Sequence, residues 1–170
     1  PIDERSKAGL EEEHQWQVAM KQLDQTPPLH TLQINSFDAL FLPGGHGTMF
    51  DLPGNPVLER AIRTIYESGK IVAAVCHGPA GLIDVKLTNG QFIAKGKKLT
   101  AFTNVEERLA KYDPYMPFLL ESRLREQGAL FSAEPAWSDH VVRDGNLITG
   151  QNPQSSISVA QAVIEALTRH

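Results

Sequence analysis

The chain has a single cysteine, Cys76, and its position suits a nucleophile. It directly follows the apolar run of residues 71–75, and Gly78 and Pro79 begin a short helix just after it. In open α/β sheets, ligands gather at the carboxyl ends of strands, and a sharp strand-to-helix turn presents its side chain to them. The helix start favours an anion, so we expect a lowered thiol pKa and a reactive Cys76. The competing interpretation is a buried core thiol.

Candidate partners for this thiol lie next to it or at the end of another predicted strand. His77 is the candidate base, because cysteine catalysis needs a proton acceptor. The alternative is a packed or surface histidine. A third group should orient the imidazole, and Glu106 or Glu107, which follow a third predicted strand, can supply it. Each can instead be an exposed carboxylate at a helix start.

Three loops complete the candidate site. The Gly-Gly-His-Gly turn of residues 44–47 can aim backbone N–H groups at a developing oxyanion, or it is simply a tight turn. It matches neither the dinucleotide fingerprint nor the Walker loop. Residues 137–140 and 150–156 can contact substrate, with loop packing and helix capping as the alternatives. The six histidines show no His-x-x-x-His spacing, so we predict no metal site.

The elements that must position these residues alternate between strands and helices. Residues 38–42 and 71–75 are continuous apolar runs, typical of strands buried on both faces. The helix between them begins at Asn55 and Pro56 and ends at Gly69. This order predicts a parallel sheet with right-handed crossovers. The pattern also predicts helices within 10–20, at 78–83, after Asn104, at 118–127 and at 155–167, strands at 98–103 and 129–131, and a hairpin over 141–149.

Composition excludes several classes of protein. The chain has 170 residues, 41% of them hydrophobic and 21% charged, with a formal net charge of −4, so it offers no basic surface for nucleic acid or an anionic membrane. No apolar run approaches the roughly 18 residues of a membrane span. One cysteine excludes an intrachain disulfide and indicates a reducing compartment.

Several ordered motifs resemble those of the ThiJ/PfpI superfamily, whose fold is glutamine-amidotransferase-like and flavodoxin-like. The motifs are DALFLPGGHG at residues 38–47 and AVCHGPA at residues 74–80, supported by residues 99–107, 137–139 and 147–153. The closer resemblance is to the glyoxalase III-like, stress-chaperone branch. It implies an α/β fold, a flavodoxin-like three-layer sandwich with a mostly parallel central sheet and a nucleophile elbow.

The resemblance also implies roles for particular residues. Cys76 is similar to the nucleophile, His77 to its partner, and Glu107 to the third member of the triad, with Glu106 as the register alternative. The other implied positions are Gly45 and His46 in the oxyanion hole and Trp137 and Asn152 in the substrate pocket.

The activity that the resemblance implies is glutathione-independent conversion of methylglyoxal to lactate. The thiolate adds to the aldehyde, and an enediol-like intermediate and hydrolysis follow, with no metal or other cofactor. The implied partners are small reactive dicarbonyls or glycated and misfolded proteins in the cytoplasm. Two alternatives stay open: a Cys-dependent amidase or peptidase, and a non-catalytic holdase chaperone or redox sensor.

One departure from the family pattern concerns the N-terminal region. The family begins with a strand, a helix and a second strand ahead of the segment matched here, and a Glu near the end of its first strand contacts the Cys. Residues 1–36 are polar and place no Glu at a strand end. We therefore expect a single domain over 1–170, with an irregular or helical segment at 1–36 and a core at 37–170, that is N-terminally incomplete. Such a domain should expose an apolar sheet edge and form a homodimer or associate with the missing segment.

Overall fold

The computed structural model describes residues 13–168. It divides into two units, Pro1–Leu32 and Gln33–His170. In the first unit, the described residues form helix α2 (His14–Leu23) and the 3-10 turn η1 (Leu29–Thr31). The start of the helix predicted within residues 10–20 lies outside the described residues. Within residues 13–168, no helix is both long and apolar enough to cross a membrane.

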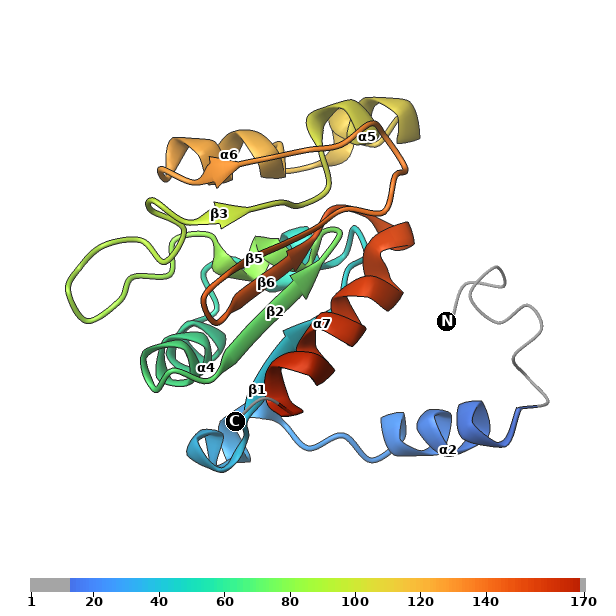
Figure 1. Ribbon diagram of the computed structural model, residues 1–170, viewed down its shortest axis with the longest axis vertical. Helices are drawn as coiled ribbons and strands as arrows, with labels where there is room; N and C mark the ends of the chain where they lie inside the picture. Colours follow the sequence, from blue (N-terminus) through green and yellow to red (C-terminus); the bar gives the residue numbers. More distant parts are fainter. Residues whose placement is uncertain (1–12, 169–170) are drawn as a thin grey trace. The chain divides into compact units, whose positions relative to one another are not determined.

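The second unit contains both strands and helices, which alternate up to the last three strands (Figure 1). The strands are β1 Ala39–Leu42, β2 Ile71–Val75, β3 Lys98–Leu99, β4 Leu130–Phe131, β5 Val141–Asp144 and β6 Leu147–Gly150. The α-helices are α3 Thr48–Asp51, α4 Pro56–Glu67, α5 Asn104–Ala110, α6 Leu120–Glu126 and α7 Ser156–Thr168. The 3-10 helices are η2 Ile34–Ser36, η3 Gly78–Leu82, η4 Asp113–Tyr115 and η5 Pro153–Ser155.

The main sheet has the strand order β1-β2-β6-β5. The first three strands run parallel, and the hairpin partner β5 is antiparallel to β6. All five residues of β2 are buried, which is why its sequence reads as an unbroken apolar run. Its alternate residues Ile71, Ala73 and Val75 join a core cluster with residues of α7, and α4 lies on the other side of the sheet (Figure 1). The predicted three-layer α/β fold with a mostly parallel sheet is confirmed.

Local sequence signals explain most of the element boundaries. The Asn55 side chain accepts hydrogen bonds from the N–H groups of Val57 and Leu58, so it caps α4 as predicted. The predicted Asn104 cap is wrong, because Thr103 is the N-cap of α5 and forms a capping box with Glu106. The helix predicted at 78–83 is a 3-10 helix, and the strand predicted at 98–103 ends at Leu99.

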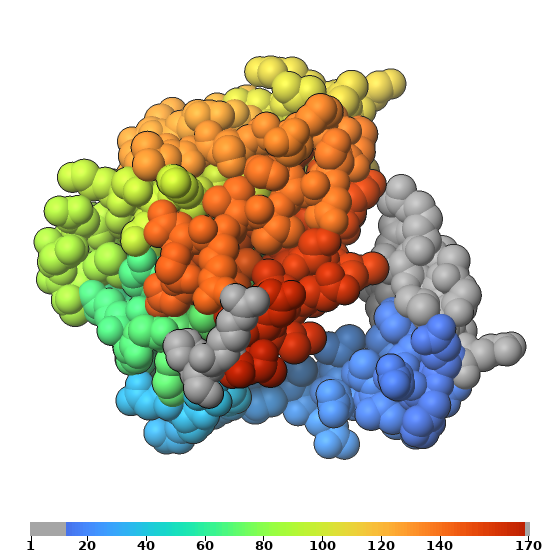
Figure 2. Space-filling model, in the orientation of Figure 1, coloured from blue at the N-terminus to red at the C-terminus, as the bar shows by residue number. Residues whose placement is uncertain are grey.

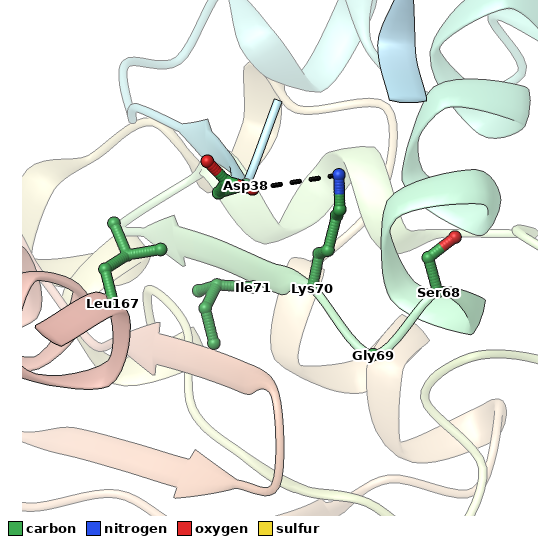
Figure 3. Close-up of a pocket in the computed structure, with 6 residues that line it drawn as sticks. All are labelled: Asp38, Ser68, Gly69, Lys70, Ile71 and Leu167. Atoms are coloured by element: carbon green, nitrogen blue, oxygen red, sulfur yellow. Dashed lines mark ion pairs between the residues drawn. The ribbon is translucent and has the colours of Figure 1, made fainter. Parts of the chain in front are cut away.

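Apolar side chains lie exposed at the sheet edge and on the outer face of α7. Phe41 of the edge strand β1 is 39% exposed. Ile157 and Ile164 of α7 are 73% and 61% exposed, and α7 forms part of the molecular surface in Figure 2. A cavity of about 490 Å³ lies at the amino end of β2, where Lys70 points toward Asp38 with 3.8 Å between Nζ and Oδ1 (Figure 3). Since Cys76 follows the carboxyl end of β2, this cavity is not the candidate active site.

Candidate active site

Cys76 lies at a sharp turn where β2 ends and η3 begins. Its φ angle is 61°, in the left-handed region that non-glycine residues rarely adopt. Two hydrogen bonds hold this backbone in place: the Cys76 N–H donates to the Gly150 carbonyl at 2.9 Å, and the Cys76 carbonyl accepts the Phe102 N–H at 2.9 Å. A strained residue fixed by its surroundings is typical of functional turns. This is the geometry of a nucleophile elbow.

Two glycines let neighbouring backbone approach this elbow. A Cβ on Gly44 would lie 2.6 Å from the Cys76 Cβ, and a Cβ on Gly78 would lie 2.1 Å from the Leu42 carbonyl oxygen. Neither position has room for a side chain. The turn after β1 is therefore packed directly against the thiol.

His77 connects the thiol to a carboxylate. Its Nδ1 lies 3.4 Å from the Cys76 Sγ, and its Nε2 lies 2.6 Å from the Glu107 Oε2. The His77 side chain is 1% exposed. A neutral imidazole with its hydrogen on Nε2 satisfies both contacts, because Nε2–H donates to the carboxylate while the Nδ1 lone pair faces the thiol. His77 is thus placed to accept the thiol proton.

The protonation of the thiol differs from the sequence-based expectation. The pKa of Cys76 is raised to about 11, mainly by burial and to a smaller degree by the nearby Glu106 and Glu107 carboxylates, while the N–H groups of Gly45 and His77 act in the opposite direction. The predicted lowering of this pKa is wrong, because the side chain is largely withdrawn from water and η3 is only a five-residue 3-10 helix. At neutral pH the resting group is therefore a neutral thiol.

Glu107 holds two imidazoles with its two oxygens. Besides His77 at Oε2, it accepts a hydrogen bond at Oε1 from the His46 Nε2 at 2.8 Å. Burial alone would raise the pKa of Glu107, but the hydrogen bonds and charges of His77 and His46 outweigh it, so the pKa lies below its ordinary value. The carboxylate is therefore ionised. A carboxylate at this point accepts the hydrogen on Nε2 and holds the His77 ring with its Nδ1 toward the thiol.

His46 enters the site through its side chain. Its ring centroid lies 4.2 Å from that of His77 and 4.5 Å from that of Tyr112. The N–H groups that act on the Cys76 sulfur are those of Gly45 and His77. The sequence pattern predicted a role only for the backbone of His46. The contact of its imidazole with Glu107 and its packing against Tyr112 were not predicted. These contacts join distant segments, so sequence spacing carries no signal for them.

Glu106 faces away from His77 and binds other segments. Its Oε2 accepts the Thr103 N–H at 3.0 Å and the Thr103 hydroxyl at 2.8 Å. Its Oε1 accepts the Trp137 N–H at 2.9 Å, the Gln151 amide at 3.1 Å and the Asn152 amide at 2.8 Å. Five donors surround a side chain that is fully buried. Through these contacts Glu106 holds the surrounding loops together. Glu107 is the carboxylate that lies beside His77.

The two predicted pocket residues belong to this Glu106 network. Trp137 is 40% exposed, has a φ of 68° and places its ring 5.6 Å from that of Phe102, which packs on His77. The Asn152 amide is fully buried, donates to Glu106 and the Ser138 carbonyl, and caps η5. Trp137 therefore borders the site, whereas Asn152 contacts Glu106 and Ser138 and does not line the site itself.

Three side chains here also form a set of possible metal ligands. Ligand atoms of His46, His77 and Glu107 all lie within 4.8 Å of one another. They come from three separate segments, so the absence of His-x-x-x-His spacing in the sequence could not reveal them.

Comparisons with known proteins agree on one family. The family model described as DJ-1/PfpI matches residues 15–166. Glyoxalase 3 of Candida albicans is 36% identical over 160 residues, covering 89% of this chain and 66% of the relative. Glutathione-independent glyoxalase HSP31 of Saccharomyces cerevisiae is 38% identical over 141 residues, covering 78% of this chain and 59% of the relative. The chain thus spans less than two thirds of the length of these curated relatives.

Solved structures show the same fold. The Rapid Encystment Protein of 24 kDa from Francisella tularensis has a TM-score of 0.89 at 37% identity, over 98% of this chain and 76% of that one. Glyoxalase III from Candida albicans has a TM-score of 0.77 at 35% identity, over 81% of this chain and 60% of that one.

Proposed function

The chain belongs to the DJ-1/PfpI family, and from this premise we propose that it is a glutathione-independent glyoxalase that converts methylglyoxal to lactate with Cys76 as nucleophile. The observation that carries the proposal is the continuous contact from the Cys76 Sγ to the His77 Nδ1 at 3.4 Å and from the His77 Nε2 to the Glu107 Oε2 at 2.6 Å. Curated relatives with glyoxalase names at 36% and 38% identity support the choice of reaction.

The first step is addition of the sulfur to the aldehyde carbon. As the C–S bond forms, the thiol proton moves to the His77 Nδ1, and the carbonyl electron pair moves to the oxygen. We assign the oxyanion to the N–H of Gly45, which already faces the sulfur, and to the N–H of His46, which follows in the same turn. The proton then passes from His77 to this oxygen, which gives a hemithioacetal.

The second step moves one hydrogen between the two substrate carbons. His77 removes the proton from the carbon bound to sulfur, which gives an enediolate, and then returns this proton to the neighbouring carbon. The hydroxyl proton of the first carbon moves to the oxygen of the second, so that the first carbon regains a carbonyl and the second gains a hydroxyl. The first carbon is thereby oxidised to a thioester and the second is reduced to an alcohol, so no external oxidant or reductant is required. Water then hydrolyses the thioester, which releases lactate and restores the Cys76 thiol. Throughout, Glu107 keeps His77 oriented and stabilises its charged form.

The test is lactate formation from methylglyoxal by the purified chain, without glutathione and in the presence of a chelator. We expect Cys76→Ala to abolish turnover and Cys76→Ser to reduce it severely. The matched control is His30→Gln, which removes an exposed imidazole of the other unit. Equal turnover by the unaltered chain and Cys76→Ala would refute the proposal.

A Cys-dependent amidase or peptidase is the second candidate, because the same thiol, imidazole and Gly45 N–H can serve acyl transfer. A Cys76-dependent burst of product from an activated ester, without lactate formation from methylglyoxal, would favour it. The redox-sensor alternative has less support, since Cys76 is 8% exposed and burial raises its pKa, whereas sensor thiols are exposed and acidic. A small reactive dicarbonyl as substrate and a cytoplasmic location belong to the main proposal.

A further inference from the structure

Three potential metal ligands converge on one point beside Cys76. His46 comes from the turn after β1, His77 from the elbow and Glu107 from α5, and their ligand atoms lie within 4.8 Å of one another. We propose that His46 Nε2, His77 Nε2 and a Glu107 oxygen bind a divalent transition-metal ion of the Zn²⁺ type, and that the bound ion blocks the Cys76 site.

The donor set fits this class of ion. Two imidazoles and one carboxylate form a ligand set that zinc uses at sites with an open fourth position. Magnesium and calcium prefer oxygen ligands, and Mg²⁺ demands octahedral geometry, so one carboxylate with two imidazoles selects against them. The Glu107 charge supplies part of the neutralisation that a divalent ion needs.

The distances require only a small movement. Metal–ligand bonds of about 2.0–2.2 Å in a tetrahedron place the ligand atoms roughly 3.3 Å apart. The His46 Nε2 now lies 2.8 Å from one Glu107 oxygen and the His77 Nε2 lies 2.6 Å from the other. An ion entering between them must therefore open the His46 contact by about 0.5 Å and the His77 contact by about 0.7 Å. The His46 side chain can supply the first movement, because it is 33% exposed. The contact between His77 and Glu107, which are 1% and 4% exposed, opens by a rotation of the Glu107 carboxylate.

The same exposures indicate the route of entry. An ion reaches the trio from the side of His46 and meets this imidazole first. His77 and Glu107 lie behind it and complete the coordination. His46 is thus the ligand whose removal should weaken the site while the packed residues behind it stay in place.

Metal binding changes the position of a hydrogen on His77. An imidazole that binds a metal through Nε2 carries its hydrogen on Nδ1. In His77 this hydrogen would point at the Cys76 sulfur, 3.4 Å away, and the Nδ1 lone pair that receives the thiol proton would no longer exist. The ion would thus inhibit the enzyme without using the sulfur as a ligand. The proposed binding of the metal ion depends only on the positions of the three ligands. The proposed inhibition of turnover depends also on the proposed function.

The experiment measures metal binding directly in the purified, chelator-treated chain of 170 residues. Co²⁺ is added as a spectroscopic probe, and Zn²⁺ is then titrated against it and measured alone by calorimetry. We expect one equivalent to bind, with visible Co²⁺ ligand-field bands that lack sulfur-to-metal charge transfer. On the unaltered chain, NMR should show metal-dependent shifts for two of the six histidine rings. Lactate assays with added Zn²⁺ then test inhibition as a separate readout.

Variants identify the ligands. His46→Gln should weaken Zn²⁺ binding by more than about 100-fold, because even outer partners of metal ligands are worth 10–100-fold. Cys76→Ala should retain binding, and His30→Gln should leave it unchanged. The proposal is overturned by an absence of saturable binding, by His46→Gln binding as tightly as the unaltered chain, or by loss of binding in Cys76→Ala. Failure of turnover with intact Co²⁺ binding would refute the proposed function and leave the metal site standing.

Discussion

Glu106 and Glu107 are adjacent buried carboxylates, and replacing each by glutamine should produce opposite results. Glu106 accepts hydrogen bonds from Thr103 and from three groups in two later loops, whereas Glu107 accepts hydrogen bonds from the two imidazoles His46 and His77. We predict that Glu106→Gln mainly lowers the free energy of unfolding, and that Glu107→Gln mainly lowers turnover.

The magnitude for Glu106 follows from its five donors. Glutamine offers an oxygen at one end only, so keeping the bonds from Trp137, Gln151 and Asn152 places its NH₂ group against Thr103. The Thr103 hydroxyl can rotate and accept, but the Thr103 N–H is left buried without an acceptor, which costs about 1–3 kcal/mol. The remaining bonds lose the extra strength of a charged acceptor. Together these effects amount to about 3–5 kcal/mol, a large part of the typical 5–15 kcal/mol.

Glu107→Gln should lower stability less than Glu106→Gln and should lower turnover more. The glutamine oxygen can still accept a hydrogen bond from His77, and the partly exposed His46 can change its tautomer to accept one from the new NH₂ group. We expect a loss of about 1–2 kcal/mol in stability. A neutral amide no longer stabilises the His77 imidazolium, so turnover should fall roughly 10²–10⁴-fold, the usual range for acid–base assistance.

The assay is urea unfolding of the unaltered chain and both variants, alongside lactate formation from methylglyoxal. The slopes of the unfolding curves should agree, so that the midpoints report stability. Glu106→Gln should unfold at a clearly lower urea concentration than Glu107→Gln. The reasoning is refuted if Glu106→Gln lies within about 1 kcal/mol of the unaltered chain, or if Glu107→Gln is the less stable of the two.

Three further predictions concern the elbow and the far end of β2. Because burial raises the Cys76 pKa from an ordinary value near 9 to about 11, the neutral thiol contributes stability below pH 9 that is lost as pH rises through 11, up to roughly 3 kcal/mol. With a chelator present, the rate at which native Cys76 is alkylated should therefore still rise above pH 9, and a plateau at pH 9 would contradict this. The Cys76→Ala variant should not lose stability between pH 9 and 11 in this way. Gly78→Ala should destabilise by about 3 kcal/mol or more, because its Cβ would meet the Leu42 carbonyl, while Gly47→Ala, which has open space, should change the urea midpoint little. Lys70→Met should lower stability by about 1–3 kcal/mol, because Nζ donates to two backbone carbonyls before β1; an unchanged midpoint would show that water replaces these bonds.

The sequence predicted those parts of the fold that depend on local patterns. The apolar run of β2, the Asn55 cap and the hairpin of β5 and β6 each follow from a few neighbouring residues. The end of β3 could not be predicted in this way. Beyond Leu99 the backbone no longer pairs with a neighbouring strand. The Thr100 N–H donates to the Thr149 hydroxyl, and the Phe102 N–H donates to the Cys76 carbonyl at the elbow.

For the candidate site too, the sequence predicted some residues and could not predict others. Cys76 and His77 could be proposed from their place after a strand, and the family motif added Glu107. The side-chain contact of His46 and the network on Glu106 could not be predicted, because they depend on how distant loops meet. The direction of the Cys76 pKa was wrong because the helix-start argument ignored burial, which only the packed structure reveals.

The hydrogen bonds on the two glutamates have a consequence for the order of folding. They join residues that are 30, 46 and 61 positions apart in the chain. Bringing such distant segments together loses loop entropy before any bond compensates for it, so contacts of this kind form slowly and late. The helices and the pairing of β5 with β6 need only local closure and can form first. A refolding chain should therefore recover its helical signal before its catalytic competence.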